Sequence, residues 1–391
     1  MLKAEEIEAI ANGSGEIAKN LHDDIINAVL KRFIDRMIRL SKIEFSATDR
    51  WQLQTLQEAG YTLADIQKEI AKATRKQVVE IKKAMTRAGI QSLRQDDEIY
   101  KLGGLPTHTP MSVEMTRIME SAYRRTMGLW NNYTGTTASQ ASDWFVDMCD
   151  RAYPLVVTGA MSYTEAIQNA IGELSTKGID VLYPSGHRDT IEVATLRAVR
   201  TAVAQTAGEI TATRANENGI HLFLTSAHMG ARPTHEVWQG KVFYVDWAKL
   251  ASVIPISIED TTDDYDLKAR YPDFVDVTQI GTVTGLCGVN CRHSYMPYIE
   301  GVSYNPFEDI DTEENNKAYE ISQKARYMER TIRRNKRKLE AYDDWRKKDP
   351  TNQRAVAEYH TVLTKIREQT SQYYDFCKQN NIKPSEIRLT I

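Results

Sequence analysis

The sequence predicts a mainly α-helical protein that carries a small α+β module. Three observations lead to this expectation. Over most of the chain, apolar residues recur every three or four positions, as they do in amphipathic helices. Between residues 220 and 305 this spacing gives way to short runs of β-branched and aromatic residues bounded by glycine and proline. The chain has 391 residues, so we expect several modules rather than one core.

The first region, residues 1–101, is expected to consist of helices that dock on a partner. Helical spacing runs from residue 22 to 40 and from 62 to Gly89, a candidate C-terminal cap, and another helix is expected to begin near Ser46. The apolar stripe of the first helix either docks on another protein or packs on the next helix of the same chain, and the sequence leaves both alternatives open. Its docking candidates are Ile26, Phe33, Met37 and Leu40.

Residues 102–112, "LGGLPTHTPMS", contain two glycines and two prolines and are typical of a connection between modules. A central helical domain is expected over residues 112–219. Ser162 and Glu165 in this domain have the spacing of a capping box at the start of a helix. Its last segment, residues 191–219, is rich in alanine and threonine. Small side chains allow close approach of neighbouring helices, so we expect this segment to be packed on several sides.

The α+β module is expected over residues 220–305, with strands in "HLFLTSA" (221–227) and "KVFYVDW" (241–247). Residues 306–391 are expected to form a charged helical hairpin that turns at "DPTN" (349–352). The first arm of the hairpin is basic, which is typical either of a solvated face or of one that contacts DNA phosphates or a partner. The candidates for that contact are Arg333, Arg334, Lys336, Arg337 and Lys338.

The segment "TGLCGVNCRH", residues 284–293, holds two of the four cysteines of the chain. Four cysteines in a chain of this length do not make a disulfide framework. Cys287, Cys291 and His293, joined by His235 from an upstream loop, are residue types that hold structural zinc. The spacing is looser than a paired C-x2-C signature, so small buried thiols beside loop-capping histidines remain the alternative. Zinc is the one cofactor that the sequence indicates.

The chain lacks the patterns of common enzymes and of membrane proteins. A Cys–His nucleophile pair requires an orienting third group, which closeness in sequence does not supply, so we expect no enzyme. The net charge of −3 argues against a surface that binds nucleic acid throughout. With no apolar run of about 18 residues and no secretory signal, we expect synthesis in the cytosol and folding without a membrane.

Three stretches together resemble the phage minor capsid protein 2 family of tailed bacteriophages. They are "YPSGHRDTIEVATLRAVRTAVAQTAGEI" (183–210), "TSAHMGARPTHEVWQGKVF" (225–243) and "GLCGVNCRHSYMPYIEGVS" (285–303). The family is similar, more distantly, to head-morphogenesis proteins of the Mu F type, which carry two short motifs in their C-terminal module. Arg232, Pro233 and His235 match the first motif, and Asn290, Cys291 and Arg292 match the second.

This resemblance implies a structural minor head protein of the virion, located at or near the portal on the inside of the head. It implies several copies per virion, contacts with the portal protein, other head proteins and packaged DNA, and residence in the host cytoplasm during assembly. The implied roles are head assembly and genome packaging or ejection. The alternative is a maturation peptidase or a nuclease that uses the loops of His235 and Cys291.

Overall fold

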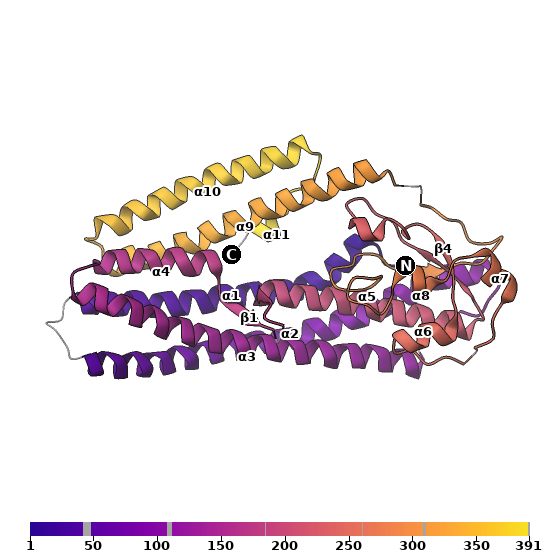
Figure 1. The fold of residues 1–391 in the computed structure, drawn as a ribbon, viewed down its shortest axis with the longest axis horizontal. Coiled ribbons are helices and arrows are strands. Elements are labelled where there is room, and N and C mark those ends of the chain that lie inside the picture. Colours follow the sequence, from indigo (N-terminus) through magenta and orange to yellow (C-terminus); the bar gives the residue numbers. More distant parts are fainter. Residues whose placement is uncertain (42–47, 108–111, 184, 260, 308–309, 390–391) are drawn as a thin grey trace. The chain divides into compact units, whose positions relative to one another are not determined.

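The computed structural model describes residues 1–391 except 42–47, 108–111, 184, 260, 308–309 and 390–391. The fold is mainly α-helical with a small region that contains β-strands, as predicted (Figure 1). In chain order the elements are α1 (Ala4–Leu40), α2 (Thr48–Leu102), α3 (Val113–Val157), α4 (Tyr163–Lys177), β1 (Asp180–Leu182), β2 (Arg188–Thr190), α5 (Ile191–Glu217), β3 (Leu222–Thr225), the 3-10 helix η1 (Pro233–His235), β4 (Val242–Tyr244), α6 (Trp247–Val253), α7 (Tyr265–Arg270), α8 (Phe274–Thr278), β5 (Tyr295–Pro297), α9 (Thr312–Lys348), α10 (Gln353–Gln379) and α11 (Glu386–Leu389).

The chain forms two compact units, each assembled from three separate segments. Unit 1 comprises Met1–Gly15, Gln77–Trp130 and Thr195–Glu320. Unit 2 comprises Glu16–Lys76, Asn131–Ala194 and Ile321–Ile391. The boundaries fall inside helices α1, α2, α3, α5 and α9. The division into four consecutive regions stays a prediction.

Helix α1 begins at Ala4, well before residue 22, where the sequence predicted its start. Gly13 and Gly15 lie inside this helix and do not end it. A Cβ atom at Gly13 would lie 2.6 Å from Glu80 Oε2 of α2, and one at Gly15 would lie 2.9 Å from Leu196 Cδ1 of α5. These glycines therefore serve close approach between helices of unit 1.

Helix α2 is one helix of 55 residues where the sequence predicted two. Gly89, the expected C-terminal cap, lies inside it, and a Cβ atom there would lie 2.7 Å from Met119 Sδ and 2.8 Å from Ile210 Cδ1. The cap assignment was wrong because this glycine accommodates neighbouring side chains instead of a turn. Ser46, the expected start of a helix, lies outside the described residues.

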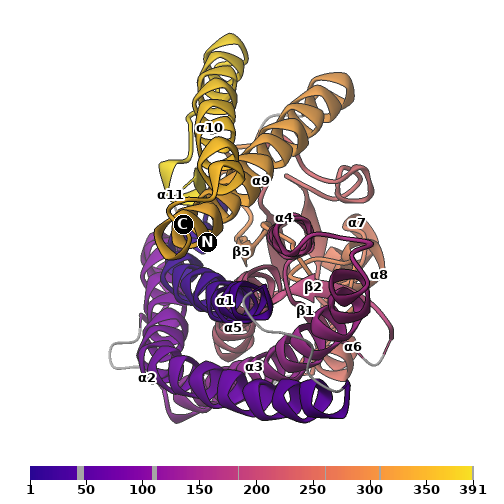
Figure 2. The ribbon, with the colours of Figure 1, turned by 90° about the vertical axis from the view of Figure 1, so that its left-hand side faces the viewer.

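Helix α5 is packed on several sides in unit 1, as its small side chains predicted (Figure 2). Thr211 Oγ1 lies 2.8 Å from Ser92 Oγ of α2, and the Arg200 guanidinium pairs with the Glu8 carboxylate of α1. On its remaining side, Gly208 O accepts a 2.7 Å hydrogen bond from the buried Tyr295 hydroxyl of β5.

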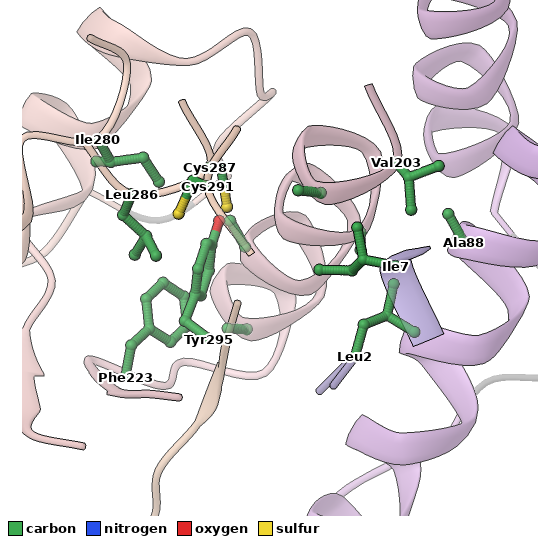
Figure 3. Packing of buried hydrophobic residues seen from close by; sticks show 14 of the residues in the cluster. Leu2, Ile7, Ala88, Val203, Phe223, Ile280, Leu286, Cys287, Cys291 and Tyr295 are labelled. Atoms are coloured by element: carbon green, nitrogen blue, oxygen red, sulfur yellow. The ribbon is translucent and has the colours of Figure 1, made fainter. Parts of the chain in front are cut away.

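Strand β3 is the centre of a three-stranded antiparallel sheet with the order β4-β3-β5. Phe223 pairs with Phe243 on one side and with Pro297 on the other. The sequence predicted β3 and β4 but not β5, since three residues that end in a proline are too short for a period-two pattern. Pairing of β3 with both neighbours brings the loop between β3 and β4 close to the loop before β5. Figure 3 shows part of the buried cluster, including Phe223 of β3, Tyr295 of β5 and the two cysteines of the loop before β5.

Helices α9 and α10 form the predicted helical hairpin of unit 2 (Figure 1). The Tyr373 hydroxyl donates a 2.7 Å hydrogen bond to Glu329 Oε1, and Asn335 Nδ2 donates one of the same length to Gln369 Oε1. Helix α4 begins at the predicted capping box, in which the Ser162 side chain accepts from the Glu165 backbone and the Glu165 carboxylate accepts from the Ser162 backbone.

The docking candidates on α1 lie inside the fold. Ile26, Phe33 and Met37 are 0% exposed, and Leu40 is partly buried. This burial agrees with the second of the two alternatives, in which the apolar stripe of the first helix packs within its own chain. Ile26, Phe33 and Met37 offer no exposed docking surface in the folded chain, because their apolar area is already removed from water.

Candidate metal centre

The pairing of β3 with β5 in unit 1 brings His235 close to Cys291 and His293, which lie more than 50 positions further along the chain. His235 is the last residue of η1, and Cys291 and His293 lie just before β5. The two Nδ1 atoms of His235 and His293 are 3.4 Å apart. Cys291 Sγ lies 3.7 Å from His293 Nδ1 and 4.0 Å from His235 Nδ1. All three side chains are buried, and their candidate ligand atoms lie within 4.8 Å of one another.

The loop before β5 reaches this position because it folds tightly on its own backbone. A Cβ atom at Gly285 would lie 1.9 Å from Gln279 O, and one at Gly288 would lie 2.5 Å from Val283 O. Cys287 and Asn290 adopt the left-handed region, with φ of 57° and 58°. Only glycine permits such close approach, so Gly285 and Gly288 are required for the turn that points the cysteines inward.

In both histidines the nitrogen that points away from Cys291, Nε2, lies within hydrogen-bond distance of an oxygen atom. His235 Nε2 lies 2.8 Å from Thr284 O, and His293 Nε2 lies 3.1 Å from Gln239 Oε1. The His228 ring stacks on the His293 ring, with centroids 4.2 Å apart and planes inclined by 22°. Both candidate ligand rings therefore have defined orientations, with Nδ1 directed toward Cys291.

Burial keeps the groups of the site neutral. Desolvation raises the pKa of the Cys287 and Cys291 thiols, and it lowers the pKa of His293 well below its usual range. The same cause lowers the pKa of His235 and brings that of His228 to about 4. A cysteine nucleophile needs a lowered pKa to form the thiolate, so the protein environment alone does not activate Cys291.

The structure brings together three of the four predicted zinc ligands. Cys287 Sγ lies 3.9 Å from His293 O and outside the three-atom group, although the two cysteines are neighbours in the core (Figure 3). Sequence reasoning missed Thr284 and Gln239, which hold the outer nitrogens. No local pattern signals these residues, because a backbone carbonyl can come from any residue and an amide side chain is common on surfaces.

The basic candidates on α9 do not share one exposed face. Arg337 is buried in unit 2, where it pairs with Asp23 and Glu192, and Arg333 Nη1 lies 3.0 Å from the same Glu192. Two of the five predicted contact residues thus point inward, because buried carboxylates require a counter-charge. Of the others, Lys336 donates a 2.6 Å hydrogen bond to the Leu389 backbone, and Arg334 and Lys338 are partly buried.

The sequence profile of the family described as phage minor capsid protein 2 matches residues 2–374 of this chain. The chain belongs to this family. This minor capsid protein is 27% identical over 318 residues to a structural protein of Lactococcus phage LL-H, which covers 78% of this chain and 80% of the relative. It is 42% identical over 73 residues to a structural protein of Lactococcus phage mv4, which covers 18% of this chain and 58% of that relative.

No solved structure matches this member of the minor capsid protein 2 family at a significant level. Among its described residues, no helix combines the length and the apolar character needed to cross a bilayer. Family membership identifies a structural protein of a bacteriophage virion, and it agrees with the resemblance of the three quoted stretches.

Proposed function

We propose that the protein lies at or near the portal on the inside of the phage head and acts in head assembly and in genome packaging or ejection. It does so by binding other head proteins, without catalysing a reaction. The observation that carries this proposal is the family match across residues 2–374. One further observation supports it: the relatives that it resembles are named structural proteins.

The proposed partners are the portal protein, other head proteins and packaged DNA, with several copies of the chain in each virion. Three DNA candidates on α9 form no ion pair in the described part of the chain: Arg334, Lys338 and Lys336, which is bonded to the Leu389 backbone. Arg333 and Arg337 are committed to Glu192 and are left out of this surface.

The position of the protein in the virion tests the proposal. A short tag would be added to the chain in the phage genome, and asymmetric reconstruction of intact heads would locate the added density. We expect the density inside the shell at the portal vertex. Density on the outer surface of the head or in the tail would contradict the proposal.

One observation favours an enzyme instead, a peptidase or nuclease active during head maturation: Cys291 Sγ lies 3.7 Å from His293 Nδ1. A phage with Cys291→Ala separates the two functions. An assembly role predicts that incorporation or solubility of the protein fails first. An enzyme predicts normal incorporation of a folded protein together with loss of a cleavage step in the head.

A further inference from the structure

We infer that His235, His293 and Cys291 bind one zinc ion through their Nδ1, Nδ1 and Sγ atoms. The ion would join the loop between β3 and β4 to the loop before β5. The inference goes beyond the proposed function and does not depend on where the protein lies in the virion. A histidine nitrogen can bind a metal only if it carries no hydrogen. The hydrogen-bond partners of His235 and His293 identify the nitrogen that carries hydrogen in each ring.

The tautomer of His235 follows from its contact with Thr284. A backbone carbonyl oxygen can only accept a hydrogen bond, so His235 Nε2, at 2.8 Å from Thr284 O, must be the nitrogen that carries hydrogen. A metal-binding imidazole is neutral and has only one N–H. His235 Nδ1 is therefore an unprotonated lone pair directed at the centre of the cluster.

The tautomer of His293 follows from the orientation of Gln239. The backbone N–H of His228 donates to Gln239 Oε1 at 3.3 Å, which identifies that side of the amide as its oxygen. The same oxygen lies 3.1 Å from His293 Nε2 and must accept from it. His293 Nδ1 is thus also a lone pair, and the stacked His228 ring limits rotation of the imidazole.

Two lone pairs that face each other at 3.4 Å cannot form a hydrogen bond. The Cys291 thiol has one hydrogen and can donate it to only one of them. When a cation binds, the Cys291 thiol releases its proton to water, and the cation takes the electron pairs of the two nitrogens and of the resulting thiolate. Without a cation, one buried acceptor of the cluster has no donor, which is unfavourable because it has lost its hydrogen bonds to water.

The distances agree with a tetrahedral ion. Zinc binds histidine nitrogen at about 2.0–2.1 Å and cysteine sulfur at about 2.3 Å, so tetrahedral geometry places two nitrogens about 3.3 Å apart and a nitrogen and a sulfur about 3.6 Å apart. The corresponding distances here are 3.4 Å, 3.7 Å and 4.0 Å. The cluster is close to the coordinating geometry without a rearrangement of the backbone.

The donor set favours zinc over harder ions, because imidazole and thiolate are its usual ligands and carboxylates are absent from this group. Thr284 O and Gln239 Oε1 supply the outer hydrogen bonds that orient metal-binding histidines. Since Cys287 Sγ lies outside the group, the inferred site has three protein ligands, and water completes the coordination.

Zinc content of the purified full-length chain tests the inference. After growth with added zinc and removal of unbound metal, elemental analysis is expected to find about one zinc per chain. Cys291→Ser and His293→Gln are expected to lower this value at least tenfold. Cys287→Ser is the matched control, and it is expected to keep the zinc. Equal loss in Cys287→Ser and Cys291→Ser would overturn the three-ligand site.

Two measurements on the unsubstituted protein keep the inference testable if the variants fail to fold. Removal of metal by a strong chelator is expected to lower the melting temperature, and stoichiometric zinc is expected to restore it. Cobalt in place of zinc is expected to produce a thiolate-to-cobalt charge-transfer band and intense tetrahedral d–d bands. A chain that takes up neither zinc nor cobalt, and whose melting the chelator leaves unchanged, would overturn the inference.

Discussion

Arg337 carries one of the charges that are buried inside unit 2. Its guanidinium pairs with Asp23 and Glu192, and all three side chains are at most 10% exposed. A basic residue in a charged helix usually points to solvent, and the sequence offers no signal that this one does not. Its position is decided by two carboxylates that come from distant helices.

Arg337→Met is expected to destabilise the protein by about 3–5 kcal/mol, because it leaves the buried Asp23 carboxylate without its arginine and removes one of the two arginines that pair with Glu192. Urea unfolding followed by circular dichroism measures this difference. Lys347→Met on the same helix is the matched control. Lys347 is exposed and its ion pair with Asp343 is at the surface, so its loss is expected to cost less than about 1 kcal/mol. Equal effects of the two substitutions would contradict the burial of Arg337.

Gly285 tests the packing of the loop that carries the cysteines. Gly285→Ala is expected to destabilise the protein by about 1–3 kcal/mol, since its methyl group would meet the Gln279 carbonyl at 1.9 Å. Gly128→Ala in α3 is the control, for which the expected change in stability has the opposite sign. No atom lies within 4 Å of a Cβ placed there, so alanine is expected to stabilise the helix by up to about 1 kcal/mol. Thermal unfolding of both variants separates the outcomes, and a neutral Gly285→Ala would argue against the tight loop.

At the scale of elements, apolar spacing predicted where helices lie but not how long they are. Gly89 was the expected end of a helix, yet it faces neighbouring side chains inside a continuous helix, as Gly13 and Gly15 do. A glycine that ends a helix and a glycine that allows close packing differ only in their tertiary surroundings. The sequence therefore ends a helix at Gly89, whereas α2 continues to Leu102.

The basic arm of α9 is the element on which the proposed DNA contact can be tested. The double substitution Arg334→Gln and Lys338→Gln is expected to weaken binding of the purified protein to duplex DNA. It is expected to reduce the slope of log K against log salt by about 0.9 for each lost phosphate contact. Lys317→Gln near the start of α9 is the control for loss of an exposed charge, and it is expected to leave the slope unchanged. Binding that does not respond to salt would contradict a phosphate contact.

At the scale of the whole molecule, each compact unit gathers segments that are more than 50 residues apart in sequence. Neither unit corresponds to one continuous stretch of the chain. Cooperative stability therefore depends on long-range contacts, among them those of α5 with α1, α2 and β5 in unit 1. One buried carboxylate of α5 gives this stability a defined dependence on pH.

Burial raises the pKa of Glu209 to about 7, against the opposing effect of the Arg125 guanidinium. The unfolded chain, in which this carboxyl has a pKa of about 4.3, releases the proton at lower pH than the folded chain does. The contribution of Glu209 is thus complete below the unfolded pKa and is lost as pH rises toward 7. Relative to Glu209→Gln, we expect the unsubstituted protein to lose up to about 3 kcal/mol between pH 4.5 and pH 8. Urea unfolding of both proteins across this pH range measures the difference in their free energies of unfolding. A difference that stays constant with pH would contradict the prediction.

Residue types alone predicted part of the candidate metal site. The composition of "TGLCGVNCRH" and the upstream His235 indicated a metal before any contact was known, since cysteine and histidine near glycine are the residues that such sites use. The ligand set depended on distances. Cys287 lies only four positions from Cys291 in sequence, but its sulfur is outside the group, while His235, 56 positions away, is inside it.

The sequence by itself determined the mainly α-helical fold, the helical hairpin, strands β3 and β4 and the phage family. Periodicity and short motifs depend only on residues that are close together in the sequence. Only the tertiary structure decided the lengths of α1 and α2, the strands β1, β2 and β5, the inward direction of Arg337 and the three atoms that converge near Cys291. Except for the pairing of β1 with β2, each of these depends on a partner far along the chain. A side chain acquires such a partner only when the backbone folds, so the local sequence pattern does not predict the contact.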